Sequence, residues 1–544
     1  MLNTPILIVG GGPVGMNLAL DLSWRDVPCI LINNLETTPN HPQGNTHNAR
    51  TMEHYRRLGI AEKIRKVGLP IDHSGDAIIV TRINGYELCR IKIPSLLERL
   101  TPGSIDLKMG PEPLHRASQM FVEGILKSEI DKRDNIDSRF GWQLNSFQNN
   151  PEYVIAKIED LKSGLIEEVN CGYLVGCDGG QSTVRKALDI KYVGKGGEEV
   201  DFMLGRMASI YFEAPDLYDV MKIDPPWQFH SMNPEGRASI VALDGKGKFL
   251  TWAKIEPDES VQKMDPKPYI KRVIGEDVPI KIISTLPWQA GLSLLANSYG
   301  DGRVLLAGDA AHLFTPTGGF GMNTGVGDAH NLGWKLAAWY QGWSGEKLIE
   351  SYEFERRQVA IRNLAQSYEL AQAKASLKVP EGVEENTKRG DTIRKKFSAE
   401  IYEALKEEYF CMGIQLGGRY DGSNLINTEE TPPPISSPYE YIATGYPGGR
   451  APHFWLKDGS ALFDNFGKYF TLLVLKGSDL ILQSIIDAAK KRGVPLSVFR
   501  DDTPEIYDLY EAELVIIRPD QYVAWRGNKI PSDPVVLIDK IVGN

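Results

Sequence analysis

The sequence lacks any apolar run of about 18 residues, the length that a membrane-spanning helix needs. It also lacks a signal-peptide pattern, because the chain enters an apolar strand and a glycine turn directly, with no basic flank and no cleavage site. Both absences argue against a membrane-spanning protein and against a protein secreted by means of a signal peptide. We therefore expect a soluble, unprocessed protein in the cytoplasm.

Cysteine is scarce, and its arrangement argues against two kinds of site. The five cysteines form no CxxC pair, and the nine histidines are dispersed without the spacing of zinc ligands. We expect no metal site and a reducing, cytoplasmic setting. The cysteines are Cys29, Cys89, Cys171, Cys177 and Cys411.

Net positive charge is absent as well. The formal net charge is −10 and the pI is about 5.6, so the chain has no broad basic field for nucleic acid or anionic lipid. We expect a small-molecule partner, no nucleic-acid or membrane partner, and a homodimer or other homo-oligomer. At about 150 residues per domain, 544 residues predict three or four structural units.

The N-terminal residues have the pattern of a dinucleotide-binding turn. An apolar strand at residues 5–9 leads into Gly10-Gly11-Gly12-Pro13-Val14-Gly15 and then into a helix of small and apolar residues. Gly10 makes the tight turn, Gly12 lets the backbone reach a pyrophosphate, and Gly15 allows close helix packing. The N–H groups at the helix start favour phosphate. The pattern predicts a Rossmann-like domain that binds its cofactor through Gly10, Gly12, Pro13, Val14 and Gly15.

The end of the second predicted strand departs from the usual pattern. Residues 28–32 should be followed by an acid that accepts hydrogen bonds from both ribose hydroxyls, but Asn33 stands there. Asn33 can still hydrogen-bond a ribose, although without a charge, or Glu36 takes this role. We favour Asn33.

Residues 302–338 contain a second succession of strand, glycine loop and helix. The apolar run at residues 304–307 predicts a buried strand, with Asp309 at its carboxyl end, where open α/β sheets bind ligands. The loop of residues 315–321 lets a backbone approach a flat ligand, and residues 322–325 open a helix with free N–H groups. This combination suits a flavin ring.

This passage resembles the FAD-dependent aromatic monooxygenases of the p-hydroxybenzoate hydroxylase and phenol hydroxylase type. The resemblance implies that Asp309 hydrogen-bonds the ribityl chain of FAD and that Pro316 lies beside the reactive face of the flavin. Gly319 and the backbone of Gly321, Met322 and Asn323 would meet the isoalloxazine, and Phe320 stands where the family often has Gln. The matching residues are Gly308-Asp309-Ala310-Ala311-His312, Pro316, Gly319, Gly321-Met322-Asn323, Asp328, Asn331-Leu332 and Trp334-Lys335-Leu336.

Three further segments match the same family. Arg50, before Thr51-Met52-Glu53, would approach the FAD pyrophosphate or ribityl region, and Gln119 would bind FAD from a helix predicted between residues 114 and 130. Asp178 and Arg185 match a motif that serves both FAD and the reductant nicotinamide. Residues 152–173, just before that motif, alternate in polarity and predict a β-hairpin.

Residues 191–295 are rich in strand-like runs with aromatic side chains. We expect a sheet, joined by strands from residues 77–93, that covers the flavin and shapes the substrate pocket. Core packing is the alternative for each aromatic side chain, because alternation alone does not identify the ligand-facing side. The candidate wall residues are Trp227, Phe229, His230, Trp252 and Trp288.

The rest of the chain predicts a charged, surface-packed helical region from residue 351 to about residue 406, a proline-rich connection and a separate unit. That unit resembles the thioredoxin-like tail of phenol hydroxylases, with Arg518-Pro519-Asp520 near its end. Because it lacks CxxC, we expect an interface or stabilising role. The fold is predicted as α/β, α+β overall: an FAD-binding domain (residues 1–76, 105–190 and 296–375), a substrate-binding sheet domain (77–104 and 191–295), a helical connection (376–430), a linker (431–452) and a thioredoxin-like domain (453–544).

The resemblance implies a single-component monooxygenase. It would use FAD, NADPH or NADH, and O₂ to hydroxylate a phenolic or catecholic ring through a flavin C4a-hydroperoxide. His47 or His230 would accept the phenolic proton, with a structural role as the alternative for each, and Pro316 completes the predicted catalytic set. The alternatives for the whole protein are a larger polycyclic or polyketide substrate, or a catalytically idle flavoprotein scaffold.

Overall fold

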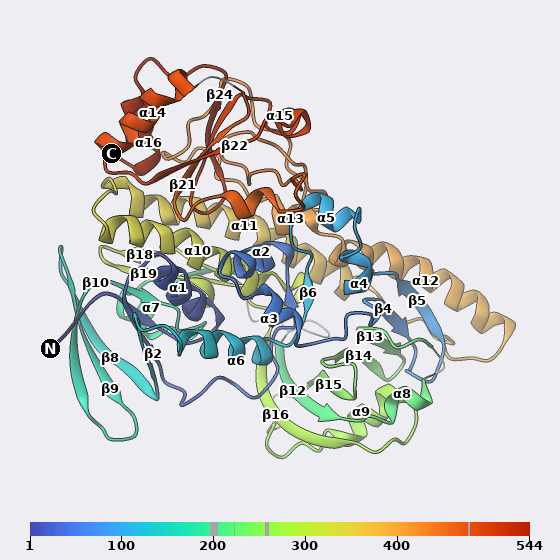
Figure 1. The fold of residues 1–544 in the computed structure, drawn as a ribbon. Helices are drawn as coiled ribbons and strands as arrows, with labels where there is room; N and C mark the ends of the chain where they lie inside the picture. The colour runs from blue at the N-terminus through green and yellow to red at the C-terminus, as the bar shows by residue number, and fades with distance from the viewer. Residues whose placement is uncertain (196–204, 222, 256–259, 477–478) are drawn as a thin grey trace.

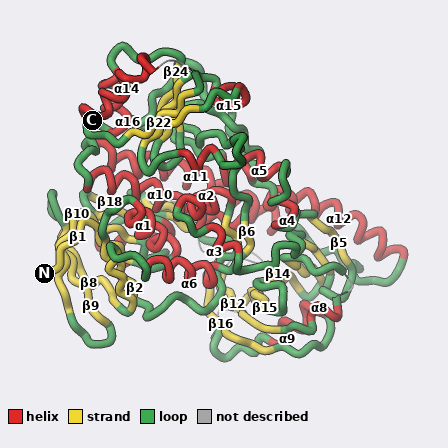
Figure 2. Tube along the Cα trace, viewed as in Figure 1, coloured by secondary structure: helices red, strands yellow, loops and turns green. Residues whose placement is uncertain are grey.

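The computed structural model describes residues 1–195, 205–221, 223–255, 260–476 and 479–544. Three large sheets lie apart from one another, and two long helices, α10 (Phe320–Tyr340) and α11 (Lys347–Ser376), cross between the first sheet and the C-terminal domain (Figure 1). Figure 2 shows the same division as three separate clusters of strands. The architecture confirms the predicted mixed α/β fold. Among the described residues, no helix is long and apolar enough to cross a membrane.

The first sheet has eight strands, and its centre is parallel and buried. The strands β1 (Leu2–Val9), β2 (Cys29–Asn33), β10 (Ile166–Gly176) and β19 (Val304–Leu306) pair in parallel, and their residues 6–9, 29–32, 173–176 and 304–306 are buried. The antiparallel pair β9 and β10 confirms the predicted hairpin. In sheet order the strands are β18 (Gly300–Asp301), β19 (Val304–Leu306), β10 (Ile166–Gly176), β1 (Leu2–Val9), β2 (Cys29–Asn33) and β7 (Ile136–Phe140), with β9 (Val154–Asp160) and β8 (Trp142–Asn149) joined at β10.

Helices pack on this sheet and around its carboxyl edge. The first of them, α1 (Pro13–Trp24), lies between α10 and α6 (Gln119–Ile130). The predicted helix at residues 114–130 is shorter than expected, since His115 and Arg116 form a strand. The other elements here are α2 (Ala49–Arg57), α3 (Ala61–Arg65), α7 (Thr183–Ala187), η1 (Gly308–Ala310), η2 (Thr317–Gly319), the pair β3 (Thr46–His47) and β6 (His115–Arg116), and the small sheet β11 (Tyr192–Lys195), β17 (Ser293–Ala296) and β20 (His312–Leu313).

The second sheet has seven strands, mostly antiparallel, and lies below α4 and α12 in Figure 1. We call it the substrate sheet. Strands from two distant parts of the sequence build it, as predicted from residues 77–93 and 191–295. In order they are β16 (Lys281–Ala290), β12 (Gly205–Glu213), β15 (Lys248–Lys254), β14 (Gly236–Ala242), β13 (Gln228–Asn233), β4 (Ala77–Val80) and β5 (Glu87–Ile91); its helices are α4 (Leu96–Arg99), α8 (Leu217–Val220) and α9 (Lys267–Ile274). The next helix along the chain from α4, α5 (Ile105–Met109), accepts a hydrogen bond from Trp455 of the C-terminal domain.

The C-terminal domain has a thioredoxin-like sheet with helices on its faces. The central strand, β21 (Phe470–Val474), is fully buried. It pairs in parallel with β22 (Leu496–Arg500) and antiparallel with β23 (Leu514–Ile517). The strands are β22 (Leu496–Arg500), β21 (Phe470–Val474), β23 (Leu514–Ile517) and β24 (Val523–Gly527), and the helices are η3 (Leu462–Asn465), α14 (Asp479–Lys491), α15 (Pro504–Tyr510) and α16 (Pro534–Val542). A connection with α12 (Lys388–Tyr409) and α13 (Met412–Leu416) precedes it.

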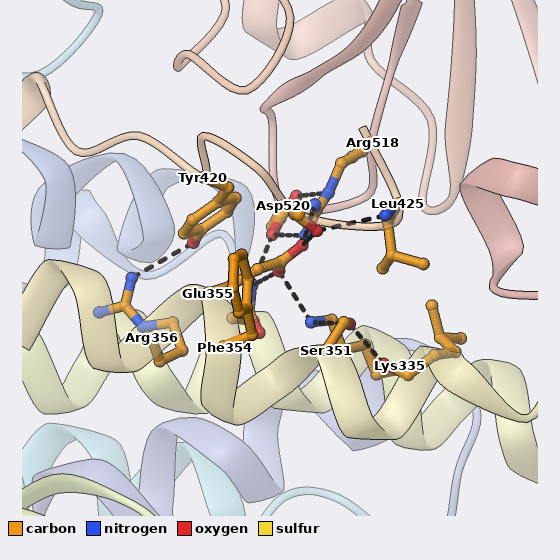
Figure 3. Close-up of polar contacts among 12 residues, drawn as sticks. Lys335, Ser351, Phe354, Glu355, Arg356, Tyr420, Leu425, Arg518 and Asp520 are labelled. Atoms are coloured by element: carbon orange, nitrogen blue, oxygen red, sulfur yellow. Dashed lines mark hydrogen bonds and ion pairs between the residues drawn. The ribbon is translucent and has the colours of Figure 1, made fainter. Parts of the chain in front are cut away.

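A buried charge network joins this domain to α11 (Figure 3). Arg518 donates to both carboxylate oxygens of Glu355, at 2.6 and 2.7 Å, and Lys335 donates to the same carboxylate at 2.8 Å. Arg518 also pairs with Asp520 at 2.8 Å. The predicted surface packing of residues 351–357 is therefore wrong for several of them, because Ser351, Tyr352, Glu355 and Arg356 are buried. The predicted helical region is also two helices, α11 and α12.

Candidate functional site

The glycine turn after β1 has the close contacts that the sequence predicts. Gly10 has φ 114°, and a Cβ there would lie 2.2 Å from the carbonyl oxygen of Cys177. A Cβ on Gly15 would lie 2.0 Å from the carbonyl oxygen of Gly10, so no side chain fits between α1 and the turn. A Cβ on Gly12 would meet nothing within 4 Å. The packing of the protein itself therefore does not require glycine at position 12. Gly12 is the N-cap of α1, which begins at Pro13 and Val14.

Asn33 holds the glycine turn in place. Its Oδ1 accepts a hydrogen bond from the N–H of Gly11 at 3.2 Å. A Cβ on Gly11 would come within 2.8 Å of the Asn33 Cβ, which shows how closely the two segments approach. Glu36, the alternative, is exposed. Asn33 remains the better placed of the two for a ribose hydroxyl.

Two aspartates lie at the carboxyl ends of neighbouring parallel strands. Asp178 follows β10, and Asp309 follows β19, which pairs with β10. One carboxylate oxygen of Asp178 accepts from the N–H groups of Thr183 and Val184, at 2.7 and 3.1 Å, whereas the other, Oδ1, is buried without a partner. Burial raises the pKa of Asp178 above its ordinary value. The Asp309 residue is exposed.

Arg185 and Tyr192 stand beside these aspartates. The Arg185 guanidinium lies 3.9 Å from the centre of the Tyr192 ring, and the Tyr192 hydroxyl donates to the backbone carbonyl of Asp309. Arg185 also donates to the carbonyl of Ile190 at 3.0 Å, and its Nε is buried without an acceptor. The sequence did not single out Tyr192, because nothing in its neighbourhood matches a motif.

The loop before α10 is shaped by two glycines with positive φ. Gly318 has φ 81° and Gly319 has φ 67°, and Gly319 is exposed at the start of α10. Pro316 precedes this turn and is partly buried. The Asn323 side chain fixes the helix start, because it donates to the carbonyls of Thr46 and Gly319 at 2.9 and 2.7 Å. Its side chain is therefore committed to the protein, whereas the backbone from Gly321 to Asn323 forms the first turn of α10.

Two predicted FAD contacts have different surroundings. Arg50 donates to Gln521 and to the carbonyl of Asp520, both at 2.6 Å, and pairs with Glu53. The guanidinium therefore joins α2 to the C-terminal domain, and its contact with FAD stays a prediction. Gln119 is buried, with its backbone N–H bonded to the carbonyl of Gly44 at 2.7 Å.

The substrate sheet turns one face towards the FAD-binding domain. His41, in the loop after β2, hydrogen-bonds Ser284 at 2.7 Å and Ser209 at 3.0 Å. Ser209 pairs with Trp252 across the sheet, and Trp252 contacts the Trp288 ring at 5.8 Å between centroids. Because side chains alternate along strands, these residues share a face. The predicted substrate contact of Trp288 stays a prediction.

Phe229 lies on the other face of this sheet. It pairs with Ile240, which pairs with Thr251, so the three side chains lie on one face of the sheet, opposite to that of Trp252. Phe229 is inaccessible to solvent and belongs to the hydrophobic core of this sheet, and its substrate contact stays a prediction. Trp227 precedes β13, packs edge-on against Tyr409 at 6.3 Å and has the Arg116 guanidinium over its ring.

Neither predicted histidine has the properties of a free base. His47 is buried beside Tyr55, and burial lowers its pKa to about 3. It points away from Thr46, which faces the Gly319 loop. Both ring nitrogens of His230 are hydrogen-bonded, to Tyr409 at 2.9 Å and to Ser239 at 3.2 Å, and burial lowers its pKa well below the ordinary value. His230 thus positions Tyr409, a residue that the sequence did not identify.

The residues at this edge fit FAD. The open position at Gly12, the unpartnered Oδ1 of Asp178 and the exposed Asp309 are what a dinucleotide would contact: its pyrophosphate at the helix start and its sugar hydroxyls at the carboxylates. The described residues contain no group of His, Cys, Asp and Glu that could hold a metal ion.

Fold and site together define a Rossmann-like dinucleotide-binding domain with a separate seven-stranded sheet. The chain belongs to the FAD binding domain family, which residues 3–367 match, and residues 444–540 match the aromatic-ring hydroxylase C-terminal family. It is an enzyme of the FAD-dependent aromatic monooxygenases, which confirms the predicted resemblance and the FAD cofactor.

Similar proteins match along almost the whole chain. A putative polyketide hydroxylase of Streptomyces halstedii is 29% identical and covers 97% of this chain and 94% of its own length. The 4-methyl-5-nitrocatechol 5-monooxygenase of a Burkholderia species is 29% identical, over 98% and 96% of the two chains. The structure of RebC with bound 7-carboxy-K252c superposes with a TM-score of 0.91 at 35% identity, over 100% of this chain and 99% of that one.

We expect Asp309 to be required for tight FAD binding. Asp309→Ala would leave cofactor hydroxyls without an acceptor, at a cost of about 1–3 kcal/mol, or about five- to 150-fold in FAD affinity. Titration of the apoprotein with FAD measures this loss. Asp301→Ala, at a nearby exposed position, is the control. Equal affinity in the Asp309 and Asp301 variants would contradict the assignment.

Proposed function

We propose that this enzyme uses NADPH or NADH and O₂ to hydroxylate an electron-rich phenolic ring within a larger aromatic molecule. The observation that carries the proposal is the meeting of two surfaces: the strand ends with Asp178 and Asp309, and the face of the substrate sheet that His41 ties to the same domain. The relatives named for a polyketide and for a catechol support an aromatic substrate of this kind.

FAD, when bound, would supply the redox chemistry, namely hydride acceptance from the nicotinamide and activation of O₂. The chain's own residues bind and orient. The start of α1 at Gly12 receives the pyrophosphate, Asp309 and Asn33 receive sugar hydroxyls, and the Gly319 loop receives the flavin ring. Asp178 and Arg185 stand where the nicotinamide would approach.

The substrate face supplies shape and exclusion of water. Trp252 and Trp288 offer apolar rings on which an aromatic substrate can stack. His230 holds the Tyr409 hydroxyl, whose pKa burial keeps well above its ordinary value, so Tyr409 stays a neutral hydrogen-bonding group. A dry, neutral pocket protects a reactive oxygen species from water.

Substrate is expected to control the consumption of reductant. With a phenolic ligand bound, NAD(P)H oxidation should rise about tenfold or more, because about 1.4 kcal/mol of preferential binding to the reducible arrangement suffices. A panel of simple phenols, catechols and polycyclic phenols, assayed by NAD(P)H absorbance with mass spectrometry of products, tests this.

The panel also distinguishes the substrate classes. Stimulation with a product heavier by one oxygen from the polycyclic phenols supports the proposal as stated, whereas activity on simple phenols or catechols alone would reduce it to a small-ring hydroxylase. Equal oxidation with and without every ligand would contradict a monooxygenase function.

A further inference from the structure

Arg116 lies between the flavin domain and the substrate sheet. It belongs to β6, pairs with Thr46 of β3 and donates from Nη1 to the Thr46 hydroxyl. Its guanidinium carbon lies 3.5 Å from the centre of the Trp227 ring. Trp227 in turn packs against Tyr409, the partner of His230 on the substrate face. Arg116 therefore touches both walls between which a substrate would lie.

A single residue, Thr46, lies between the Arg116 guanidinium and the loop around Gly319, which is predicted to hold the flavin ring. The carbonyl of Thr46 accepts from Asn323 at 2.9 Å, and a Cβ on Gly319 would lie 3.5 Å from the Thr46 Cβ. The Gly319 loop and Arg116 thus contact Thr46 together. A ligand group on Arg116 would belong to a molecule that reaches towards the flavin.

Arg116 lacks a directly paired carboxylate, and Glu408, which favours its charged form, lies beyond ion-pair distance. No carboxylate of the described residues forms an ion pair with it, whereas the nearby Arg99 pairs with Asp106 at 2.6 Å. The Nε of Arg116 is buried without an acceptor, and so is the indole Nε1 of Trp227. Burial, together with repulsion from Arg99, lowers the pKa of Arg116 to about 9. A guanidinium in this setting is unusual, because buried charges are ordinarily paired.

We propose that Arg116 binds a carboxylate carried by the aromatic substrate and thereby sets the enzyme's specificity for acidic substrates. With Nη1 engaged by Thr46, the described residues offer no acceptor to Nε and Nη2, the edge from which arginine pairs with a carboxylate through two parallel hydrogen bonds. A carboxylate is ionised at neutral pH, whereas a phenol, with a pKa of about 10, is not. The inference rests on the proposed function, since it assumes an aromatic ligand at this site.

The test compares two ligands of the same shape. The FAD-loaded protein is titrated with 1-hydroxy-2-naphthoate and with 1-hydroxy-2-naphthamide, and dissociation constants are taken from the change in flavin absorption. The native protein should bind the acid about 10- to 100-fold more tightly than the amide. Arg116→Gln should remove that preference by weakening the acid alone. Arg389→Gln, which removes an exposed arginine, is the matched control and should leave both constants unchanged.

Arg116→Lys keeps the charge but lacks the two-bond edge, so it should retain only part of the preference. It also serves where Arg116→Gln loses FAD or fails to fold. Three results would overturn the proposal: no preference for the acid in the native protein, no binding of the acid, or equal weakening of both ligands by the substitutions at Arg116.

This titration needs no turnover, so it separates the inference from the proposed function. A preference for the acid without ligand-stimulated NAD(P)H oxidation would reject the proposed reaction and keep the carboxylate site. Stimulated oxidation without a preference would do the reverse.

Discussion

Replacing Glu355 with alanine is expected to cost about 3–5 kcal/mol of stability, because it leaves the buried cations Arg518 and Lys335 without their shared carboxylate. The urea-unfolding midpoint should fall, and limited proteolysis should release the C-terminal domain at lower urea than in the native protein. The side chains of Glu355, Arg518 and Lys335 are all inaccessible to solvent, so water cannot replace the lost contacts.

Glu350→Ala is the control for this prediction. Glu350 lies on the same helix but is exposed, and its loss should change stability by less than about 0.5 kcal/mol. If the variants at 350 and 355 unfold at the same urea concentration, the network does not hold the C-terminal domain in place.

The same network predicts a direction for acid sensitivity. Burial alone would raise the pKa of Glu355, but Arg518 and Lys335 together outweigh burial and hold the pKa well below its ordinary value. A carboxylate with a lowered pKa stabilises the fold above the unfolded value of about 4.3, and this contribution is lost as the pH falls below that value. The stability difference between the native protein and Glu355→Ala should therefore shrink below about pH 4.3.

The second large effect is expected at the glycine turn, where two substitutions should separate folding from cofactor binding. Gly15→Ala should destabilise the FAD-binding domain by about 1–3 kcal/mol and impair FAD binding, because the new Cβ would lie 2.0 Å from the carbonyl oxygen of Gly10. Gly12→Ala should leave the melting temperature of the apoprotein nearly unchanged, since its Cβ meets nothing within 4 Å and its φ of −77° suits any residue. Its FAD affinity should nevertheless fall about 10- to 100-fold, because the pyrophosphate can no longer reach the helix start.

Gly124→Ala provides the matched control. Gly124 is exposed within α6 and has open space around it, so alanine should stabilise the helix by about 0.5–1 kcal/mol with no effect on FAD. Full FAD affinity in Gly12→Ala would mean that the pyrophosphate binds elsewhere.

The sequence predicted those parts of the site in which local backbone geometry decides the residue. Gly10 has a positive φ of 114°, a Cβ on Gly15 would lie 2.0 Å from the carbonyl oxygen of Gly10, and Asp309 directly follows a buried strand. Each of these features involves residues close together in the sequence. The face of the sheet on which Phe229 lies could not be predicted in this way, because it depends on the pairing of Phe229 with Ile240 on the neighbouring strand. Alternation gives a strand two faces without saying which one meets the ligand.

Contacts with residues far along the chain explain why the surroundings of Arg50 and Glu355 were not predicted. Arg50 and Glu355 both meet residues of the C-terminal domain, in the segment from Arg518 to Gln521. Judged from its sequence neighbours alone, each looks like an ordinary charged side chain on a helix surface. The buried partner that changes this interpretation is far along the chain, and the only local sign was the unusual Arg518-Pro519-Asp520 sequence itself.

The separation of Glu355 from Arg518 also bears on how the protein is made. The two residues are 163 positions apart, so a ribosome adding about 5–20 residues per second needs roughly 10–30 s to supply the arginine after the glutamate. During that time α10 and α11 hold a carboxylate that has Lys335 but still lacks the bidentate pair. The ion pair between Glu355 and Arg518 therefore forms only when the last domain has emerged. A chain truncated before Arg518 would leave Glu355 without this partner and should be more sensitive to proteases.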